Sequence, residues 1–406
     1  MNAELPSLIQ VRAFARVAEL GSISRACEAL FRAQSVVTRA ISDLEKRLGA
    51  VLFERRANGM LLTEHGKRVL PRAQRALTEL ARVPQLAGGP DRPSTEPSYL
   101  FNTRRLEIFV RLCAARHMQS VALHFSLTQP AISSALKIIE QGCGQRLFER
   151  TSRGLQPTLA AEDILVPIKR ALNELRHMDD DLAAMRGTLQ GLVTVGALPL
   201  CRTRILPQAI VQLVEAHPQV QIATQESPFE WLAGELRAGD VDFILGALRP
   251  SEYASDLWGE ALLTEEMVVL ARRGHPLLGE GVSLNDLSTA RWILPRAATP
   301  ARHLLEDYFA EIGLQPPEPV VETGDLAVIR GLLLASSMLA VVSAHQLELE
   351  IQSGELQRLP LQLRHTTRAI GLTHRANGLP SPAAQALMDE VRRVATQMGQ
   401  FLPATE

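Results

Sequence analysis

With 406 residues, of which 46% are hydrophobic and 21% charged, the chain is long enough for two to four domains with separate cores. Its longest apolar run, residues 331–344, is too short to span a bilayer, and its N-terminus has no basic-then-apolar signal peptide. We therefore expect a cytoplasmic protein. The four cysteines show no CxxC or CxxH spacing, which argues against a structural zinc site.

The net charge of -1 conceals an uneven distribution. Residues 1–98 carry 15 Lys and Arg against 10 Asp and Glu, residues 99–186 carry 12 against 9, and the remainder carries 16 against 25. A basic N-terminal part and an acidic C-terminal part are typical of a nucleic-acid-binding domain joined to a domain that does not bind nucleic acid. A solvated face with surplus arginine would give the same excess, so charge alone does not decide.

Three helices come first in the predicted chain order. They span Leu8–Leu20, a short stretch that begins after Ser22 as N-cap, and Gln34–Leu48. Apolar residues recur every three or four positions in the third helix, and short polar groups lie on its other side. A turn and the run Leu52–Arg55 lead into a wing, and a helix follows over Glu64–Val83. Two helices joined by a short turn, the second with a polar front edge, can present side chains to a major groove.

The same pattern occurs a second time, 95 positions later and without a gap. The matching pairs are Phe14 and Phe109, Gln34 and Gln129, Glu45 and Glu140, Gly49 and Gly144, Leu52–Arg55 and Leu147–Arg150, Gly59 and Gly154, and Thr63 and Thr158. A gapless register over about fifty residues indicates an internal duplication.

The segment between the two copies, residues 84–98, collects proline and glycine and predicts a semi-extended linker that leaves the first copy some freedom. The second copy runs from Tyr99 to Thr158, and Ala160–Met185 follows as one long helix with an apolar stripe. Because no partner for this stripe is evident in the chain, we expect it to pair with its copy in a second subunit. The alternative is a helix packed on its own module.

From Gly191 onward, strands and helices alternate, which indicates a parallel sheet covered by helices. The order of elements suggests two α/β lobes with the chain crossing between them, like a periplasmic binding protein. Strands are predicted at Leu192–Leu198, Val220–Thr224, Val241–Leu248, Met267–Ala271, Trp292–Leu294, Pro319–Glu322, Met338–Val342 and Ala369–Thr373. Helices are predicted at Ile205–His217, Glu230–Ala238, Ala301–Ile312, Asp325–Leu334 and Pro382–Met398.

Both copies resemble the winged helix-turn-helix of LysR-type transcriptional regulators. The motifs are Ser22–Ala26, Gln34–Arg39 and Leu52–Arg55 with Thr63 and Gly66 in the first copy, and Thr128–Ser133 and Arg146–Arg150 in the second. The blocks Gly191–Gly196, Ile205–Pro207, Gly239–Asp242 and Gly274–Leu277 resemble the effector domain of that family, and Arg368–Thr373 resembles its branch of sugar-binding-protein and protocatechuate regulators.

The resemblance implies a multidomain fold of two all-α winged helix-turn-helix modules plus an α/β two-lobed, periplasmic-binding-protein-like effector domain. It implies double-stranded DNA and a small-molecule effector as partners, a homodimer or homotetramer, and no resident cofactor. A second module departs from the family's plan of one per chain. The expected parts are a first DNA-binding domain at 1–83, a linker at 84–98, a second DNA-binding domain at 99–158, a linker and dimerisation helix at 159–186 and the effector-binding domain at 187–406.

The candidate DNA contacts lie on the polar edge of each third helix and before each wing. Glutamine amides suit the N6/N7 edge of adenine, arginine suits guanine or phosphate, and hydroxyls with helix-start amides suit phosphates. A solvated surface is the alternative for any single residue. The predicted set is Arg32, Gln34, Ser35, Thr38, Arg39, Arg55, Arg56, Gln129, Ser133, Lys137 and Arg153.

The two copies differ in charge. We expect the second copy to bind DNA more weakly, because each missing phosphate interaction lowers the affinity for DNA. Where the first copy has Arg32, Arg39, Lys46, Arg47 and Arg56, the second has Leu127, Ser134, Gln141, Gly142 and Thr151.

A ligand of the α/β region is expected between the lobes, at strand ends and helix starts. Two arginines and several hydroxyls among the candidates favour an anionic or polyhydroxy small molecule, although helix caps and surface charges would look alike. The candidates are Pro199, Arg202, Thr203, Glu226 and Ser227 on one lobe, and Arg296, Thr299, Thr323 and Ser343 on the other.

Three other functions compete with a regulator. An enzyme would need a motif such as a Gly-rich phosphate loop, GxSxG or HExxH, and the sequence contains none of these. A transport-type binding protein would explain the lobes but would need export, and a redox sensor would have to use Cys201 without a resolving partner. Only a ligand-responsive, non-enzymatic transcriptional regulator also explains the duplicated helix-turn-helix pattern.

Overall fold

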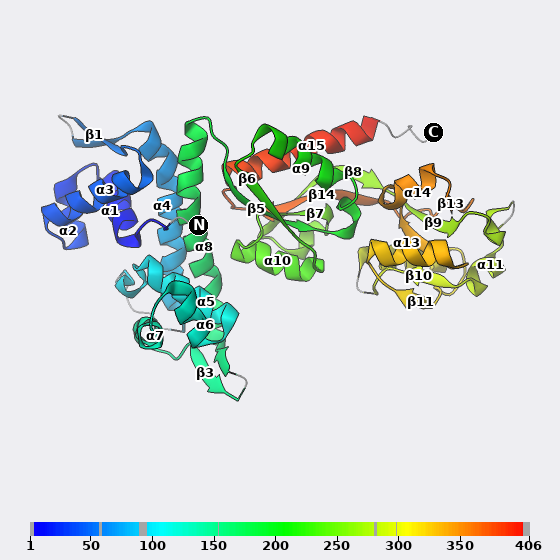
Figure 1. Ribbon diagram of the computed structural model, residues 1–406, viewed down its shortest axis with the longest axis horizontal. Helices are drawn as coiled ribbons and strands as arrows, with labels where there is room; N and C mark the ends of the chain where they lie inside the picture. Colours follow the sequence, from blue (N-terminus) through cyan, green and yellow to red (C-terminus); the bar gives the residue numbers. More distant parts are fainter. Residues whose placement is uncertain are drawn as a thin grey trace. The chain divides into compact units, whose positions relative to one another are not determined.

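The computed structural model describes residues 4–56, 59–88, 96–152, 154–279, 282–297 and 299–400 (Figure 1). The chain divides into two compact units. The N-terminal unit contains the chain up to Gly191, and the C-terminal unit contains the rest except residues 237–240 and 381–383, which group with the first. No helix among the described residues is long and apolar enough to cross a membrane.

The first module follows the predicted order of elements. Ser22 caps the second helix as expected, because its side chain accepts a hydrogen bond from the backbone N–H of Arg25. Thr63 caps the long helix in the same way, accepting from the N–H of Gly66 at 3.0 Å. The elements are α1 (Leu8–Leu20), α2 (Ile23–Leu30), α3 (Gln34–Leu48), β1 (Phe53–Arg56), β2 (Gly59–Leu62) and α4 (Glu64–Leu86).

The second module repeats these elements and their internal contacts. The carboxylate of Glu45 accepts from the N–H of Leu52 at 2.7 Å, and that of Glu140 accepts from the N–H of Leu147 at 2.8 Å. Each module also contains an antiparallel hairpin, β1 with β2 and β3 with β4, so the expected description "all-α" is wrong. The elements are η1 (Ser98–Leu100), α5 (Thr103–Ala115), α6 (Met118–Phe125), α7 (Gln129–Cys143), β3 (Phe148–Thr151), β4 (Gly154–Pro157) and α8 (Leu159–Met185).

The long helices α4 and α8 pack side by side in the N-terminal unit (Figure 1). Their ion pairs join Arg68 to Asp181 and Arg75 to Glu174, so the two helices run antiparallel. The apolar stripe of α8 is buried, and α4 lies along it. The expectation that this stripe has no partner within the chain is therefore wrong. The buried residues of the pair include Val69, Ala73, Ala76, Leu80 and Val83 on α4, and Ile164, Ile168, Leu172, Leu175, Met178 and Leu182 on α8.

The two modules form one body rather than a tethered pair, because a single cluster of buried apolar side chains extends from Leu8 to Leu182. Helix α4 continues to Leu86, so residues 84–86 are helical instead of belonging to the predicted linker. Residues 89–95 lie outside the described residues. Beyond them, Glu96 forms ion pairs with Arg12 and with Arg16 of α1, which fixes the chain against the first module.

The C-terminal unit has two lobes, each with a five-stranded sheet of order β6-β5-β7-β14-β8 or β11-β10-β12-β9-β13. The expected parallel sheets are mixed, because β14 runs antiparallel to β7 and β8, and β9 antiparallel to β12 and β13. The chain passes from the first lobe to the second between Glu265 and Met267, and returns in β14. The predicted two-lobed arrangement is confirmed in this respect.

The strands of this unit are β5 (Gly191–Ala197), β6 (Val220–Gln225), β7 (Phe243–Ala247), β8 (Leu257–Glu265), β9 (Met267–Arg272), β10 (Trp292–Leu294), β11 (Pro319–Glu322), β12 (Leu339–Ser343), β13 (Leu356–Arg358) and β14 (Arg368–Arg375). The α-helices are α9 (Ile205–Ala216), α10 (Phe229–Ala238), α11 (Leu284–Thr289), α12 (Pro300–Glu311), α13 (Leu326–Ala335), α14 (Glu348–Gln352) and α15 (Pro382–Gln400). Short 3-10 turns include η2 (Pro199–Cys201) and η5 (Ala344–Leu347).

Candidate functional site

The front edge of α3 is fully accessible. Gln34, Ser35 and Thr38 are exposed, while Val37 and Ile41 on the opposite face are buried in the module. Helix α3 begins at Gln34 without a side-chain cap, so no capping side chain accepts a hydrogen bond from the N–H groups of its first turn. The helix therefore offers amide, hydroxyl and backbone donors together, which is what base edges and phosphates accept.

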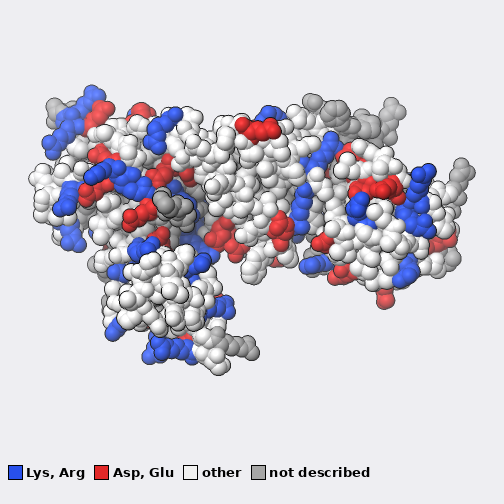
Figure 2. Space-filling view, in the orientation of Figure 1, with Lys and Arg blue, Asp and Glu red and all other residues white. Residues whose placement is uncertain are grey.

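Cations flank this edge. The side chain of Arg39 is 84% exposed and lies 3.7 Å from Asp43, too far for a hydrogen bond that would hold it. Arg32 is exposed before α3, and Arg55 and Arg56 are exposed on β1. Figure 2 shows Lys and Arg gathered over the β1 end of the first module and over the β3 end of the second.

The second module repeats the accessible edge on α7. Gln129, Ser133 and Lys137 are exposed, whereas Ile132 and Leu136 are buried beneath them. The remaining candidate of this module, Arg153, lies outside the described residues.

One of the charge differences between the modules has a packing role. Arg47 donates to Asp179 of α8 at 3.0 Å and to the carbonyl of Glu4 at 2.9 Å, so it joins α3 to α8 instead of facing solvent. Its counterpart Gly142 leaves room for Tyr99, because a Cβ at this position would overlap the tyrosine ring. Counting Arg47 among the first module's phosphate contacts is therefore wrong.

Restoring a cation at that position should not create a DNA contact. We expect Gly142→Arg to lower the free energy of unfolding by about 1–3 kcal/mol, because it overpacks the Tyr99 site, without raising DNA affinity. Gln141→Lys, on an exposed neighbour, is the matched control and should leave stability within about 0.5 kcal/mol. Urea unfolding and a DNA titration check both statements, and unchanged stability of Gly142→Arg would contradict them.

In the C-terminal unit, the first-lobe candidates gather after β5 and β6. Arg202 is half-buried, and its Nε donates to the carbonyl of Ala197 at 2.8 Å. Burial lowers the pKa of Arg202, while the charges of Glu226 and Asp325 act in the opposite direction. Carboxylates of both lobes therefore act electrostatically on Arg202. The neighbouring candidates Pro199 and Ser227 are partly exposed.

Two of the four second-lobe candidates form local hydrogen bonds through threonine hydroxyls. The Thr299 hydroxyl donates to the carbonyl of Arg296 at 2.7 Å and also caps α12. Thr323 accepts from the N–H of Asp325 at 3.0 Å, and Arg296 itself is exposed. Of this group, only Ser343 is fully buried.

Ser343 belongs to a buried polar cluster that the sequence did not predict. Its hydroxyl accepts from Arg368 Nη2 at 2.7 Å, and Arg368 pairs in register with Glu265 between β14 and β8. His345 Nε2 lies 3.7 Å from Glu265. One carboxylate oxygen of Glu265 and Nε of Arg368 are buried without a hydrogen-bond partner. Burial raises the pKa of Glu265 and lowers that of Arg368.

Cys201 lies beside this cluster and is fully buried. Burial raises the pKa of its thiol, and the charge of Glu265 raises it further. A redox-sensing cysteine needs an exposed, low-pKa thiol. The structure therefore argues against Cys201 as a redox sensor.

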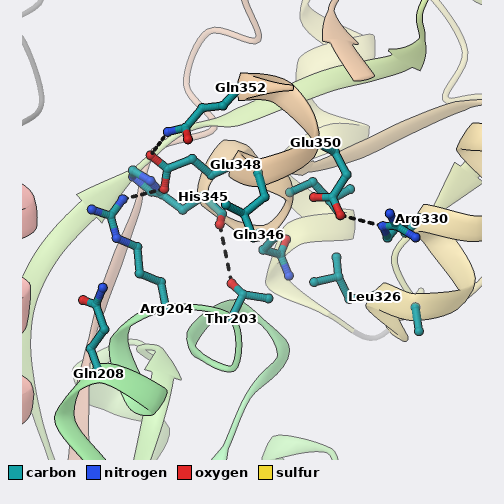
Figure 3. Close-up of a pocket in the computed structure, with 13 residues that line it drawn as sticks. Thr203, Arg204, Gln208, Leu326, Arg330, His345, Gln346, Glu348, Glu350 and Gln352 are labelled. Carbon is teal, nitrogen blue, oxygen red and sulfur yellow. Dashed lines mark hydrogen bonds and ion pairs between the residues drawn. The ribbon is translucent and has the colours of Figure 1, made fainter. Parts of the chain in front are cut away.

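A cavity of about 670 Å³ opens between the two lobes (Figure 3). On the first-lobe side, Thr203 lies 3.5 Å from the carbonyl of His345, and Arg204 pairs with Glu348. On the second-lobe side, Arg330 pairs with Glu350 at 2.5 Å. The volume of the cavity suits a small molecule, and each of its two arginines is paired with a carboxylate. Of the predicted ligand contacts, only Thr203 lines this cavity.

Comparison with protein families matches both parts of the chain. The model described as "LysR substrate binding domain" matches residues 186–396. The model described as "Bacterial regulatory helix-turn-helix protein, lysR family" matches residues 8–67 and again residues 103–162. The chain belongs to the LysR family. It is a transcriptional regulator with a DNA-binding helix-turn-helix and an effector-binding domain, as the resemblance implied.

Individual relatives agree. The chain is 65% identical to the HTH-type transcriptional regulator GalR of Pseudomonas putida over 397 residues, covering 98% of this chain and 99% of that protein. It is 26% identical to GbpR of Azospirillum brasilense, covering 74% and 88% respectively. The structure of full-length CbnR complexed with its target DNA is similar in fold, with a TM-score of 0.54 at 21% identity, covering 72% of this chain and 99% of that one.

Proposed function

We propose that this regulator carries two tandem winged helix-turn-helix modules and that both contact DNA. The observation that carries the proposal is the pair of accessible polar edges on α3 and α7, each next to a hairpin with exposed arginine. Such an edge enters the major groove while the wing contacts the flanking backbone. We also propose that the protein acts in the cytoplasm, where a DNA-binding regulator meets its target.

The first module supplies most of the DNA affinity. It presents Arg32, Arg39 and Arg56, where the second module has Leu127, Ser134 and Thr151. Fewer cations at the phosphates mean both weaker binding and a smaller salt dependence of binding. The footprint of the protein on the DNA upstream of its own gene tests the proposal, and absence of any protected site would contradict it.

The effector is an anionic or polyhydroxy small molecule bound between the lobes. Support comes from the cavity that Thr203 and Glu348 line, and from Arg202, which directly precedes Thr203 in the chain. A neutral hydroxyl-rich ligand suits the balanced ion pairs of the cavity, whereas an anion suits Arg202 and the buried Arg368. No resident cofactor is needed for either. Occupancy changes DNA affinity if the effector binds one arrangement of the lobes better than the other.

The expected test variant is Arg202→Ala. We expect it to raise the effector concentration for half-maximal response about tenfold or more, the effect of removing one charge-assisted hydrogen bond of about 1.4 kcal/mol or more. Affinity for DNA without effector should stay unchanged. Arg296→Ala tests the second-lobe candidate in the same titration, and Arg358→Ala, on an exposed arginine of β13, is the control. A normal response of both Arg202→Ala and Arg296→Ala would exclude these arginines from the effector site.

LysR-family regulators form oligomers, and we propose a homodimer or homotetramer for this chain. Because the apolar stripe of α8 is covered by α4, the contact between subunits lies on other surfaces. Light scattering of the full chain measures the assembly, and a monomer that binds DNA at full strength would contradict this proposal.

A further inference from the structure

The pairing of α4 with α8 has approximate two-fold symmetry. Arg75 Nε lies 2.8 Å from Glu174, and Arg170 Nη1 lies 3.4 Å from Glu79. The 95-residue shift that relates the modules exchanges these two ion pairs, since it carries Arg75 onto Arg170 and Glu79 onto Glu174. The two helices of one chain thus pair as two copies of a single helix would pair in a symmetric dimer.

Other ion pairs of the same interface break this symmetry. Arg72 Nε lies 2.9 Å from Asp181, and Arg68 Nη2 lies 3.1 Å from the other oxygen of the same carboxylate. Arg72 also reaches Glu174 at 2.9 Å. The Arg72 side chain is 1% exposed and that of Asp181 is 2% exposed, so these charges are fully enclosed.

The shift replaces three members of these asymmetric pairs by residues of the wrong chemistry, whereas Glu174 corresponds to another carboxylate, Glu79. Pro167 corresponds to Arg72, Asp163 to Arg68, and Leu86 to Asp181. Two copies of α8 paired in the same register would set each buried Asp181 against proline and a second aspartate. Two copies of α4 would set each buried Arg72 against leucine at the position of Asp181, and would leave it one carboxylate, Glu79, in place of two. A pair of α8 helices therefore encloses two uncompensated carboxylates, which is strongly unfavourable. A pair of α4 helices loses one carboxylate partner of each buried arginine, whereas the pair of α4 with α8 keeps every partner.

Contacts at the start of each module favour pairing within one chain. The Thr103 hydroxyl of α5 donates to the carbonyl of Pro6 at 2.9 Å and accepts from the N–H of Leu8 at 3.0 Å. Glu96 holds Arg12 and Arg16 of α1. The chain that enters the second module is thereby bound to the first module before α8 is reached.

We propose that the α4–α8 pair is a heterotypic lock that makes one chain a complete, two-part DNA-reading unit and disfavours pairing of either helix with its own copy. The inference rests on the proposed DNA-binding function for its consequence, not for the pairing itself. Because α3 and α7 present different side chains, the DNA element that one chain reads has two unlike halves.

Cross-linking of the full chain tests the pairing. Arg75→Cys combined with Glu174→Cys places two thiols at a contact between the helices, and a short bis-maleimide joins them. Denaturing electrophoresis should show a new species with the mass of one chain. A species with the mass of two chains would overturn the proposal. The wild type, with Cys27, Cys113, Cys143 and Cys201, and the two single variants report background reaction.

The same sample tests the consequence for DNA. The cross-linked chain should bind the DNA upstream of its own gene within about threefold of the untreated double variant, a difference below 1 kcal/mol. A reduction above about tenfold in the cross-linked sample alone would show that the locked form is not the DNA-reading form. If neither sample nor the wild type binds, the proposed function fails, while the mass of the cross-linked species still decides the pairing.

A symmetric DNA tests the unlike halves. In this DNA, the half protected by the second module is replaced by an inverted copy of the other half. We expect its affinity to fall about tenfold or more, because each mismatched base pair costs about 1–3 kcal/mol. Equal or tighter binding would overturn the assignment of one unlike half to each module.

Discussion

Arg72→Ala should destabilise the N-terminal unit by about 3–5 kcal/mol, because removing one partner of a buried ion pair leaves an uncompensated charge. Asp181 keeps Arg68, and Glu174 keeps Arg75, but both of these arginines are partly exposed. The fully enclosed positive charge between the two carboxylates disappears. A change of this size lowers the melting temperature of a unit with about 190 residues by roughly 10 °C.

Two spectroscopic signals separate the units in this experiment. All three tryptophans, Trp231, Trp258 and Trp292, lie in the C-terminal unit, whereas far-ultraviolet circular dichroism reports on helices of both. We expect Arg72→Ala to shift a circular-dichroism transition while the tryptophan transition stays in place. Arg82→Ala is the control, since Arg82 lies on the same helix, is 52% exposed and pairs with Glu79. It should cost less than about 1 kcal/mol, and equal destabilisation in both variants would contradict the lock.

Gln34→Ala combined with Arg39→Ala should weaken specific DNA binding by about 2–6 kcal/mol, since a good bidentate base contact is worth about 1–3 kcal/mol. Both side chains are exposed on α3 and contribute nothing to the buried core, so the folded state should persist. Fluorescence anisotropy with the upstream DNA measures the change, and circular dichroism confirms the fold.

The matched variant in the second module is Gln129→Ala with Lys137→Ala. Because α7 has Ser134 in place of Arg39, we expect a smaller reduction in affinity and a smaller change in salt dependence. A larger reduction from this second pair would reverse the roles of the two modules.

The helices of the modules are predictable because residues at each boundary determine where the helix begins and ends. Ser22 precedes an apolar-periodic run, and α3 ends before Gly49, which adopts a left-handed conformation at φ 63°. The accessible edge of α3 follows from the same 3.6-residue period, so the candidate DNA contacts are also predictable, and those within the described residues are all exposed.

The partner of α8 is not predictable from periodicity, because an apolar stripe does not say which other stripe covers it. The relevant signal is the charge pattern. Arg68, Arg72 and Arg75 on α4 recur at helical spacing, and Glu174 and Asp181 on α8 match them in opposite order. Comparing the charges of the two helices with each other would have shown their pairing.

The effector region is harder to predict because its polar groups meet through strand crossings. Strand β8 is not predicted, because Gly259 and Glu260 interrupt its apolar pattern. Glu265, at the end of this strand, is therefore not recognised as a candidate site residue either. Arg368 and Glu265 come together only because β14 pairs antiparallel with β8, a pairing that a parallel-sheet prediction excludes. Local sequence gives no signal of that contact.

A hydroxyl-radical footprint of the wild type beside the two double variants tests the central claim most directly. The wild type should protect two unlike sets of positions on the DNA upstream of its own gene. Gln34→Ala with Arg39→Ala should erase one set, and Gln129→Ala with Lys137→Ala should weaken the other. Protection that neither variant changes, or a single set that only one variant affects, would contradict a chain that reads DNA with both of its modules.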